Sequence, residues 1–179
     1  MVTHALRMLG GMIHSRPMTA SKATAPVVEI RDTGVDELRE HSASLQKEHW
    51  DEIALHKEVM ELNPNWHYYY ELEERGTLVM LAAWLQRKTS EKLVGYSVSF
   101  QFMHHHYSGL MVMQNDVVFV TKRMRSAGVG KKLMAETMAI ARESGCGMVL
   151  MHSKPGTAFD RLLEADGWGV QDIVRSKVI

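Results

Sequence analysis

Residues 117–134 read VVFVTKRMRSAGVGKKLM, and they contain the clearest structural signal in the chain. The apolar run at 117–120 is typical of a buried strand. Two glycines, Gly128 and Gly130, then stand where a helix is expected to begin, and glycine lets a backbone turn sharply and approach another group closely. The first four N–H groups of a helix have no partner inside that helix. We therefore predict that this strand-to-helix turn binds an anion such as a phosphate.

Basic residues around the turn favour a phosphate ligand, because Arg and Lys add positive charge beside it. These residues are Arg123, Arg125, Lys131 and Lys132. A Walker loop is excluded because no glycine stands at position 125, and a dinucleotide fingerprint is excluded because Leu133 takes the place of its third glycine. The pattern R-x-x-G-x-G does fit, at residues 125–130. A turn that uses glycine for packing alone is the alternative.

The apolar patterns on both sides of this turn predict a single α/β domain with a mixed, largely antiparallel sheet flanked by helices. Helices are expected at 129–143 and 157–168, together with a pair inside 32–62 that breaks near 47–50. Thr33 and Asp36 resemble a capping box at the start of that pair. Strands are expected at 27–31, 77–85, 93–103, 110–120, 147–153 and 169–179. The expected order is therefore β-αα-βββ-α-β-α-β.

Charge and cysteine content narrow the classes of partner and compartment. Lys+Arg and Asp+Glu both number 21, so no excess of positive charge favours nucleic acid as a partner. No apolar run approaches the ~20 residues that a membrane span needs. The single cysteine, Cys146, excludes an internal disulfide and fits a reducing compartment. We therefore expect a cytoplasmic protein without nucleic-acid or membrane partners.

Residues 1–25 are expected to form a flexible tail ahead of a domain at 26–179. No acidic residue precedes Glu29, and a few basic residues lie among Ser, Thr and Met. This composition also fits an organelle transit peptide. The alternative to a transit peptide is a disordered tail, or a start codon assigned too early.

Residues 26–179 contain the R-x-x-G-x-G loop after a strand, the expected element order and Asp-Gly-Trp at 166–168. In these features they resemble the GNAT superfamily of acetyl-CoA-dependent acyltransferases. The resemblance implies an N-acetyltransferase that moves an acetyl group from acetyl-CoA directly to a primary amine of a small molecule or a protein. Residues 48–66, 103–107 and 114–120 also look like the phage-encoded branch of the superfamily. The resemblance further implies a coenzyme A site at Val118, Phe119, Val120, Arg125, Ser126, Ala127, Gly128, Val129, Gly130 and Lys131.

Acetyl transfer requires a neutral amine, and only about one lysine-type amine in 2,500 is neutral at pH 7, so a positioned base is useful. Asp116 is the candidate, because GNAT enzymes with a carboxylate base commonly carry Glu at the matching place. A structural acid at a strand edge is the alternative. Many GNAT members also carry a Tyr, as an acid toward the departing thiolate, where this chain has Leu163. Tyr107 or a water would replace it, or the thiolate, with a pKa of about 8.5, leaves unaided.

Other functions and features stay open at this point. A non-catalytic acyl-CoA-binding module, favoured by Leu163, and an interaction domain that binds no nucleotide are the alternative functions. A homodimer is a further expectation, with the final strand as a possible edge for pairing. His104–His106 have no acid or cysteine at ligand spacing, so no metal site is expected. The aromatic residues at 66–70 either wall an acceptor pocket or close the core.

Overall fold

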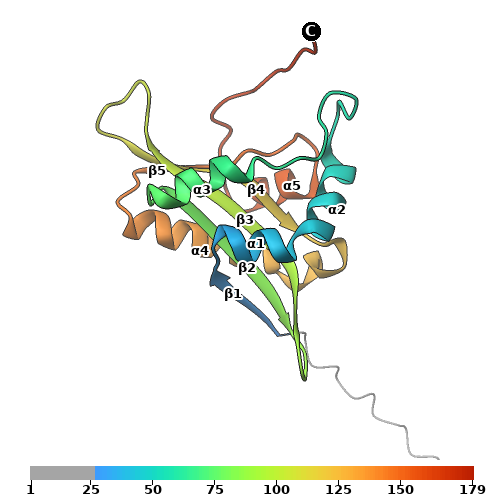
Figure 1. Cartoon of the computed structure of the whole chain (residues 1–179). Helices are drawn as coiled ribbons and strands as arrows, with labels where there is room; N and C mark the ends of the chain where they lie inside the picture. The colour runs from blue at the N-terminus through green and yellow to red at the C-terminus, as the bar shows by residue number, and fades with distance from the viewer. Residues whose placement is uncertain (1–26) are drawn as a thin grey trace, which may run out of the picture.

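The computed structural model describes residues 27–179, which form one five-stranded sheet with helices on both faces (Figure 1). The predicted tail at 1–25 lies outside the described residues. β1 to β4 pair antiparallel with their neighbours, and β5 runs parallel to β4. The prediction of a mixed, largely antiparallel α/β domain is therefore confirmed. The strands, in their spatial order, are β1 (Val28–Asp32), β2 (Leu78–Gln86), β3 (Glu91–Met103), β4 (Met111–Val120) and β5 (Met148–Leu150).

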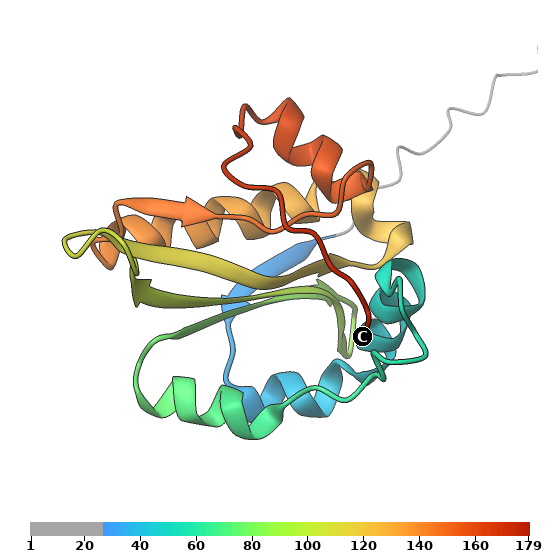
Figure 2. The ribbon, with the colours of Figure 1, turned by 90° about the horizontal axis from the view of Figure 1, so that it is seen from above.

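Helices cover the two faces of the sheet as separate layers (Figure 2). One face carries α1 (Val35–His41), α2 (Ala43–Ile53) and α3 (Trp66–Glu74). The other face carries α4 (Val129–Glu143) and α5 (Ala158–Ala165). A short 3-10 helix, η1 (Lys122–Ala127), joins β4 to α4. Within residues 27–179, no helix is long and apolar enough to cross a membrane.

The sequence of β2 shows why the sheet needs both layers. Its residues LVMLAAWLQ are apolar almost throughout, and successive side chains of a strand point to opposite faces. Met80, Ala82 and Trp84 join the core beneath α1 and α2. Leu81 and Ala83 join the core beneath α4. A strand buried on both faces is apolar throughout, because neither set of alternate side chains meets water.

The first helical segment differs from the expectation. Its break lies at Ser42 and not at 47–50, and the helix pattern expected over 54–62 forms no helix. Leu55 and Val59 in that segment are exposed. Most helical stability in proteins comes from packing an apolar face, so an apolar stripe that meets no surface does not hold a helix.

Capping residues also differ from the expectation. The predicted capping box at Thr33 is wrong, because Glu73 of α3 accepts the hydrogen bond from the Val35 N–H at 2.9 Å and so caps α1. α3 itself was not expected from the sequence. It begins after Asn65, whose side chain accepts a hydrogen bond from the Tyr68 N–H at 3.2 Å. The cap of α1 thus comes from a residue far along the chain, which no local pattern reveals.

The expected final strand at 169–179 is absent, because these residues form no helix or strand and are exposed. Their apolar residues include Val170, Ile173 and Val174. Val170, Val174 and Val178 would share one face of an extended chain. Asp172 and Ser176 lie on that same face, so it is not a continuous apolar face. β5 is also shorter than the predicted strand at 147–153.

Candidate active site

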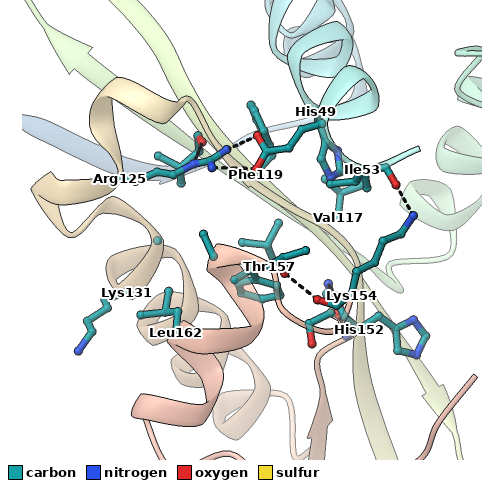
Figure 3. Close-up of a pocket in the computed structure, with 18 of the residues that line it drawn as sticks. His49, Ile53, Val117, Phe119, Arg125, Lys131, His152, Lys154, Thr157 and Leu162 are labelled. Carbon is teal, nitrogen blue, oxygen red and sulfur yellow. Dashed lines mark hydrogen bonds and ion pairs between the residues drawn. The ribbon is translucent and has the colours of Figure 1, made fainter. Parts of the chain in front are cut away.

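A cleft of about 530 Å³ opens on the sheet where β4 and β5 part (Figure 3). Residues 115–120 of β4 form one wall, and residues between 152 and 162, around the start of α5, form the opposite wall. The η1–α4 turn closes one end, and the last turn of α2 also lines the cavity. The predicted strand and the predicted loop therefore border a single cavity.

Asn115 explains why the two strands part. The β4–β5 ladder ends at the pair Gln114 and Leu150. The next residue, Asn115, is buried, and its side-chain amide donates to the His152 carbonyl at 3.4 Å and accepts from the His152 N–H. The Asn115 side chain thus makes the hydrogen bonds to His152 that the backbone of β4 would make if the β4–β5 pairing continued. Beyond it, no described strand pairs with the outer edge of β4, so this edge can pair with an extended ligand, except at the Val120 carbonyl, which accepts from Arg125 Nε.

A β-bulge in β4 carries Asp116. In the β3–β4 register, Val98 opposes Val117 and Ser99 opposes Asn115, which leaves Asp116 as the extra residue. A bulge bends its strand and re-aims a side chain, and bulges are frequent next to active sites. Asp116 is exposed and lines the cleft. The predicted base therefore stands at the cavity, on a kinked part of the strand.

The turn before α4 has the geometry expected of an anion site. Gly128 has a φ of 74°, a left-handed conformation that costs other residues about 1–2 kcal/mol. A Cβ at Gly128 would meet no atom within 4 Å, so side chains of the described residues do not fill the bend. None of these side chains caps the N-terminus of α4, and both Gly128 and Lys131 line the cleft. Gly130 serves packing, since its Cβ would stand 3.3 Å from Leu162 Cδ2 on α5.

Arg125 does not supply free positive charge to this site. Its two terminal nitrogens donate to the carboxylate of Glu52 at 2.9 and 2.7 Å, and its Nε donates to the Val120 carbonyl at 2.9 Å. This pair lowers the pKa of the Glu52 carboxyl, mainly through the hydrogen bonds from Arg125. Arg125 therefore joins α2 to the loop, and its charge is matched by Glu52 (Figure 3).

Further contacts fix α2 on both sides of the cleft. Glu48, one turn before Glu52, accepts from the Thr121 hydroxyl at 2.9 Å and from the Lys122 N–H at 3.1 Å. On the other side, the Lys154 ammonium donates to the Ile53 carbonyl at the end of α2. α2 thereby spans the cavity from the η1 side to the β5–α5 side.

The predicted coenzyme A residues are mostly brought together. Val118, Phe119, Val120, Arg125, Ser126, Gly128, Gly130 and Lys131 all line the cleft. Ala127 is exposed outside the lining, and Val129 is fully buried under the sheet, where it packs in the core. Only the backbone of these two residues could therefore take part in binding.

A model of the acetyltransferase (GNAT) family matches residues 35–159. The chain belongs to this family. The ribosomal-protein-alanine N-acetyltransferase from Brucella melitensis biovar Abortus 2308 is 18% identical, with 86% of this chain and 99% of that chain covered and a TM-score of 0.61. Glucosamine-6-phosphate N-acetyltransferase from Arabidopsis thaliana is 16% identical, with 85% and 98% covered and a TM-score of 0.64. At such identities the likeness shows the GNAT fold alone.

A third GNAT-fold structure holds a ligand. AAC(6')-Iy, in complex with the bisubstrate analogue CoA-S-monomethyl-acetylneamine, is 19% identical, with 86% and 98% covered and a TM-score of 0.58. GNAT family members use acetyl-CoA, so the open turn and the free β4 edge are the features to which such a cofactor would bind in this chain. No curated protein matches the sequence.

Two further groups beside Asp116 complete this GNAT cleft. The Tyr69 hydroxyl donates to Asp116 Oδ2, and burial, followed by the hydrogen bond to Asp116, raises the pKa of Tyr69, so Tyr69 remains a protonated donor. His49 of α2 lines the cleft with its ring centroid 4.9 Å from that of Phe119. Burial lowers the pKa of His49, which favours a neutral imidazole. The cleft thus holds a carboxylate and a neutral imidazole, and the sequence had pointed only to the carboxylate.

The structure does not bring Tyr107 to the GNAT cleft. Tyr107 lies in the β3–β4 loop, is 63% exposed and contacts His104, with 4.5 Å between the ring centroids. Met111, at that end of β4, and Asp116 are five positions apart, which is about 16 Å of strand. Tyr107 as an acid toward the thiolate therefore has no geometric support. Leu163, at the place of the family's tyrosine, is buried and also offers no acid.

Proposed function

We propose that this GNAT chain is an N-acetyltransferase that moves an acetyl group from acetyl-CoA directly to a primary amine. The observation that carries the proposal is the unpaired edge of β4 from Asp116 to Val120, which borders the same cleft as the uncapped start of α4. Asp116 and Val120 are four positions apart, which is about 13 Å of strand. A pantetheine arm along this edge would lead from a diphosphate at the turn to a thioester beside Asp116.

Main-chain groups would do most of the binding. The amides of residues 129–131, which begin α4, would hold the diphosphate, because the Gly128 N–H already donates to the Arg125 carbonyl at 3.3 Å. The exposed ammonium of Lys131 would add charge beside it. Backbone groups of Val118 to Val120 would pair with the arm, apart from the Val120 carbonyl, which already accepts from Arg125 Nε. An N–H at Val118 or Phe119 would donate to the thioester carbonyl oxygen, on which negative charge develops.

The transfer itself would use few side chains. The amine nitrogen attacks the acetyl carbon, the N–C bond forms, and the C–S bond breaks with its electron pair on sulfur. The proton from the nitrogen passes to Asp116, directly or through a water, while the Tyr69 hydroxyl orients that carboxylate. His49 is a second acceptor within the same cleft. The thiolate leaves without an acid, because its pKa of about 8.5 makes it a tolerable leaving group.

Release of free thiol from acetyl-CoA in the presence of a panel of amines tests the activity. The competing function is an acyl-CoA-binding module without catalysis, which the absence of a tyrosine at Leu163 favours. Coenzyme A binding with no thiol release from any amine would favour that module.

A variant of Asp116 tests its part in the reaction. Asp116→Asn is expected to lower turnover more at pH 7 than at about pH 9, because a larger share of the amine is neutral at high pH. Glu136→Gln, which changes an exposed carboxylate on α4 away from the cleft, is the matched control and should affect neither value. An equal loss at both pH values would remove Asp116 as the base.

Two narrower expectations accompany this proposal. Membership of the phage-encoded branch stays a prediction from residues 48–66, 103–107 and 114–120. A homodimer also stays a prediction, which sedimentation of the purified protein would test.

A further inference from the structure

A second, smaller pocket of about 170 Å³ adjoins the cleft. It lies between α2, the segment leading into α3, and the sheet face formed by β3 and β4. Four residues line both cavities: His49, Ile53, Val117 and Lys154. Tyr69 lines the second pocket while its hydroxyl bonds to Asp116 in the first. A ligand in the second pocket would therefore have one end near the proposed base.

The lining of this pocket is apolar and rich in aromatic side chains. Among residues 27–179, aromatic side chains reach it from three elements, α2, α3 and β3, and no Asp or Glu joins them. The ammonium of Lys154, which also lines it, is engaged by the Ile53 carbonyl. A second positive charge on a ligand would find no carboxylate here, and burying an unpaired charge is costly. The aromatic residues are Trp50, Trp66, Tyr69 and Tyr96.

The volume limits the size of an occupant. A cavity of about 150 Å³ lined by apolar side chains holds one benzene molecule. The pocket here, at about 170 Å³, is therefore suited to a group of about one ring. A sugar ring with several hydroxyls would also leave these polar groups without partners among apolar side chains.

We infer that this pocket holds the body of the acceptor, and that the acceptor is a primary amine on one compact apolar group with no further charge. This inference rests on the proposed function, because it places the amine nitrogen between Tyr69 and the thioester beside Asp116. Polyamines, polycationic amino sugars and phosphorylated sugars are poor acceptors on this view, because the described lining offers neither carboxylates nor a free cation to pair with them.

The first arm of the test compares three amine probes on the full chain. They are phenethylamine, spermidine and glucosamine 6-phosphate. Calorimetry measures the binding of each probe to protein saturated with coenzyme A, and thiol release from acetyl-CoA measures turnover. The expected result is measurable binding and turnover of phenethylamine, at a kcat/KM about tenfold or more above those of the other two probes.

The second arm uses a charge at the rim of the pocket. Leu62 lines the pocket and is 41% exposed, so Leu62→Glu is compatible with folding. For phenethylamine, the variant is expected to raise both Kd and KM by about tenfold or more, because a carboxylate enters an apolar site. The Kd for coenzyme A should not change. Val59→Glu is the matched control, since Val59 lies in the same segment, is exposed and lines neither pocket.

The outcomes separate this inference from the proposed function. Turnover of spermidine or glucosamine 6-phosphate at least as efficient as that of phenethylamine would overturn the acceptor class and leave the acetyltransferase standing. An equal effect of Leu62→Glu and Val59→Glu, or no binding of phenethylamine, would overturn the pocket assignment. Binding of phenethylamine that Leu62→Glu weakens, without thiol release from any amine, would support the pocket and overturn the enzyme.

Discussion

Replacing Gly128 by Glu tests whether the turn before α4 binds a diphosphate. The new side chain would enter open space, because a Cβ at Gly128 meets no atom within 4 Å. Its cost to folding therefore comes from the backbone, whose left-handed conformation disfavours any residue with a Cβ by about 1–2 kcal/mol. For a domain of this size that corresponds to a melting temperature lowered by roughly 2–8 °C. The variant should still fold, because domain stabilities are about 5–15 kcal/mol.

The effect on ligand binding is expected to be larger. The carboxylate would stand at the place of a diphosphate with two negative charges. Each pair of unit charges at 4 Å repels by about 1 kcal/mol in water and by about 4 kcal/mol at the effective dielectric constant of a protein surface. Solvent and salt at this open turn favour the low end of that range. Two such pairs then cost about 2–3 kcal/mol, which weakens coenzyme A binding by about 30-fold or more.

Calorimetry with coenzyme A at neutral pH and about 0.15 M salt measures this loss. Gly128→Ala carries the same backbone strain without the charge, and Gly128→Lys carries the strain with the opposite charge. Pantetheine, which lacks the diphosphate, should bind all three variants equally. Coenzyme A that binds Gly128→Glu as tightly as Gly128→Ala would refute the anion site, and with it the argument for the enzyme.

Three other predictions concern the walls of the cleft. A double-mutant cycle of Arg125→Gln and Glu52→Gln, measured as unfolding free energies in urea, should give a coupling free energy of about 0.5–1 kcal/mol between the two side chains at pH 7. Because the folded-state pKa of Glu52 lies below its ordinary 4.5, this coupling should persist at about pH 5 and fade as the pH falls through that lowered pKa; a coupling already lost at pH 5 would contradict it. Asn115→Ala should lower the unfolding free energy by about 1–3 kcal/mol, because the backbone groups of His152 lose their partners; an unchanged urea midpoint would show that the bridge contributes nothing. Burial lowers the pKa of His49 below its ordinary 6.5, so the unfolded chain binds more protons there and wild-type stability should fall as the pH drops below about 6.5. His49→Gln should flatten this dependence in urea unfolding, and parallel curves would argue against it.

Elements whose signals are local could be predicted from the amino-acid sequence. The helix expected at 129–143 has the observed bounds of α4, because its apolar spacing and the glycine before it act within a few residues. β2, β3 and β4 also lie within two residues of their expected ranges, since a continuous or alternating apolar run marks a strand. The resemblance of the loop and of the element order to the GNAT superfamily also predicted that Asp116 and the turn before α4 belong to one site, and both line the cleft.

Contacts between residues far apart in the sequence depend on the packed fold. Asp116 owes its position to a bulge that depends on the register with β3, and no property of β4 by itself sets that register. The hydrogen-bonded ion pair of Arg125 and Glu52 links residues 73 positions apart, and the hydrogen bonds between Asn115 and His152 link residues 37 positions apart. The second pocket likewise draws its lining from residues between Leu38 and Lys154. Each of these residues has many possible partners at a distance along the chain, and the packing of the whole sheet determines which one it contacts. A local sequence pattern therefore cannot predict these contacts.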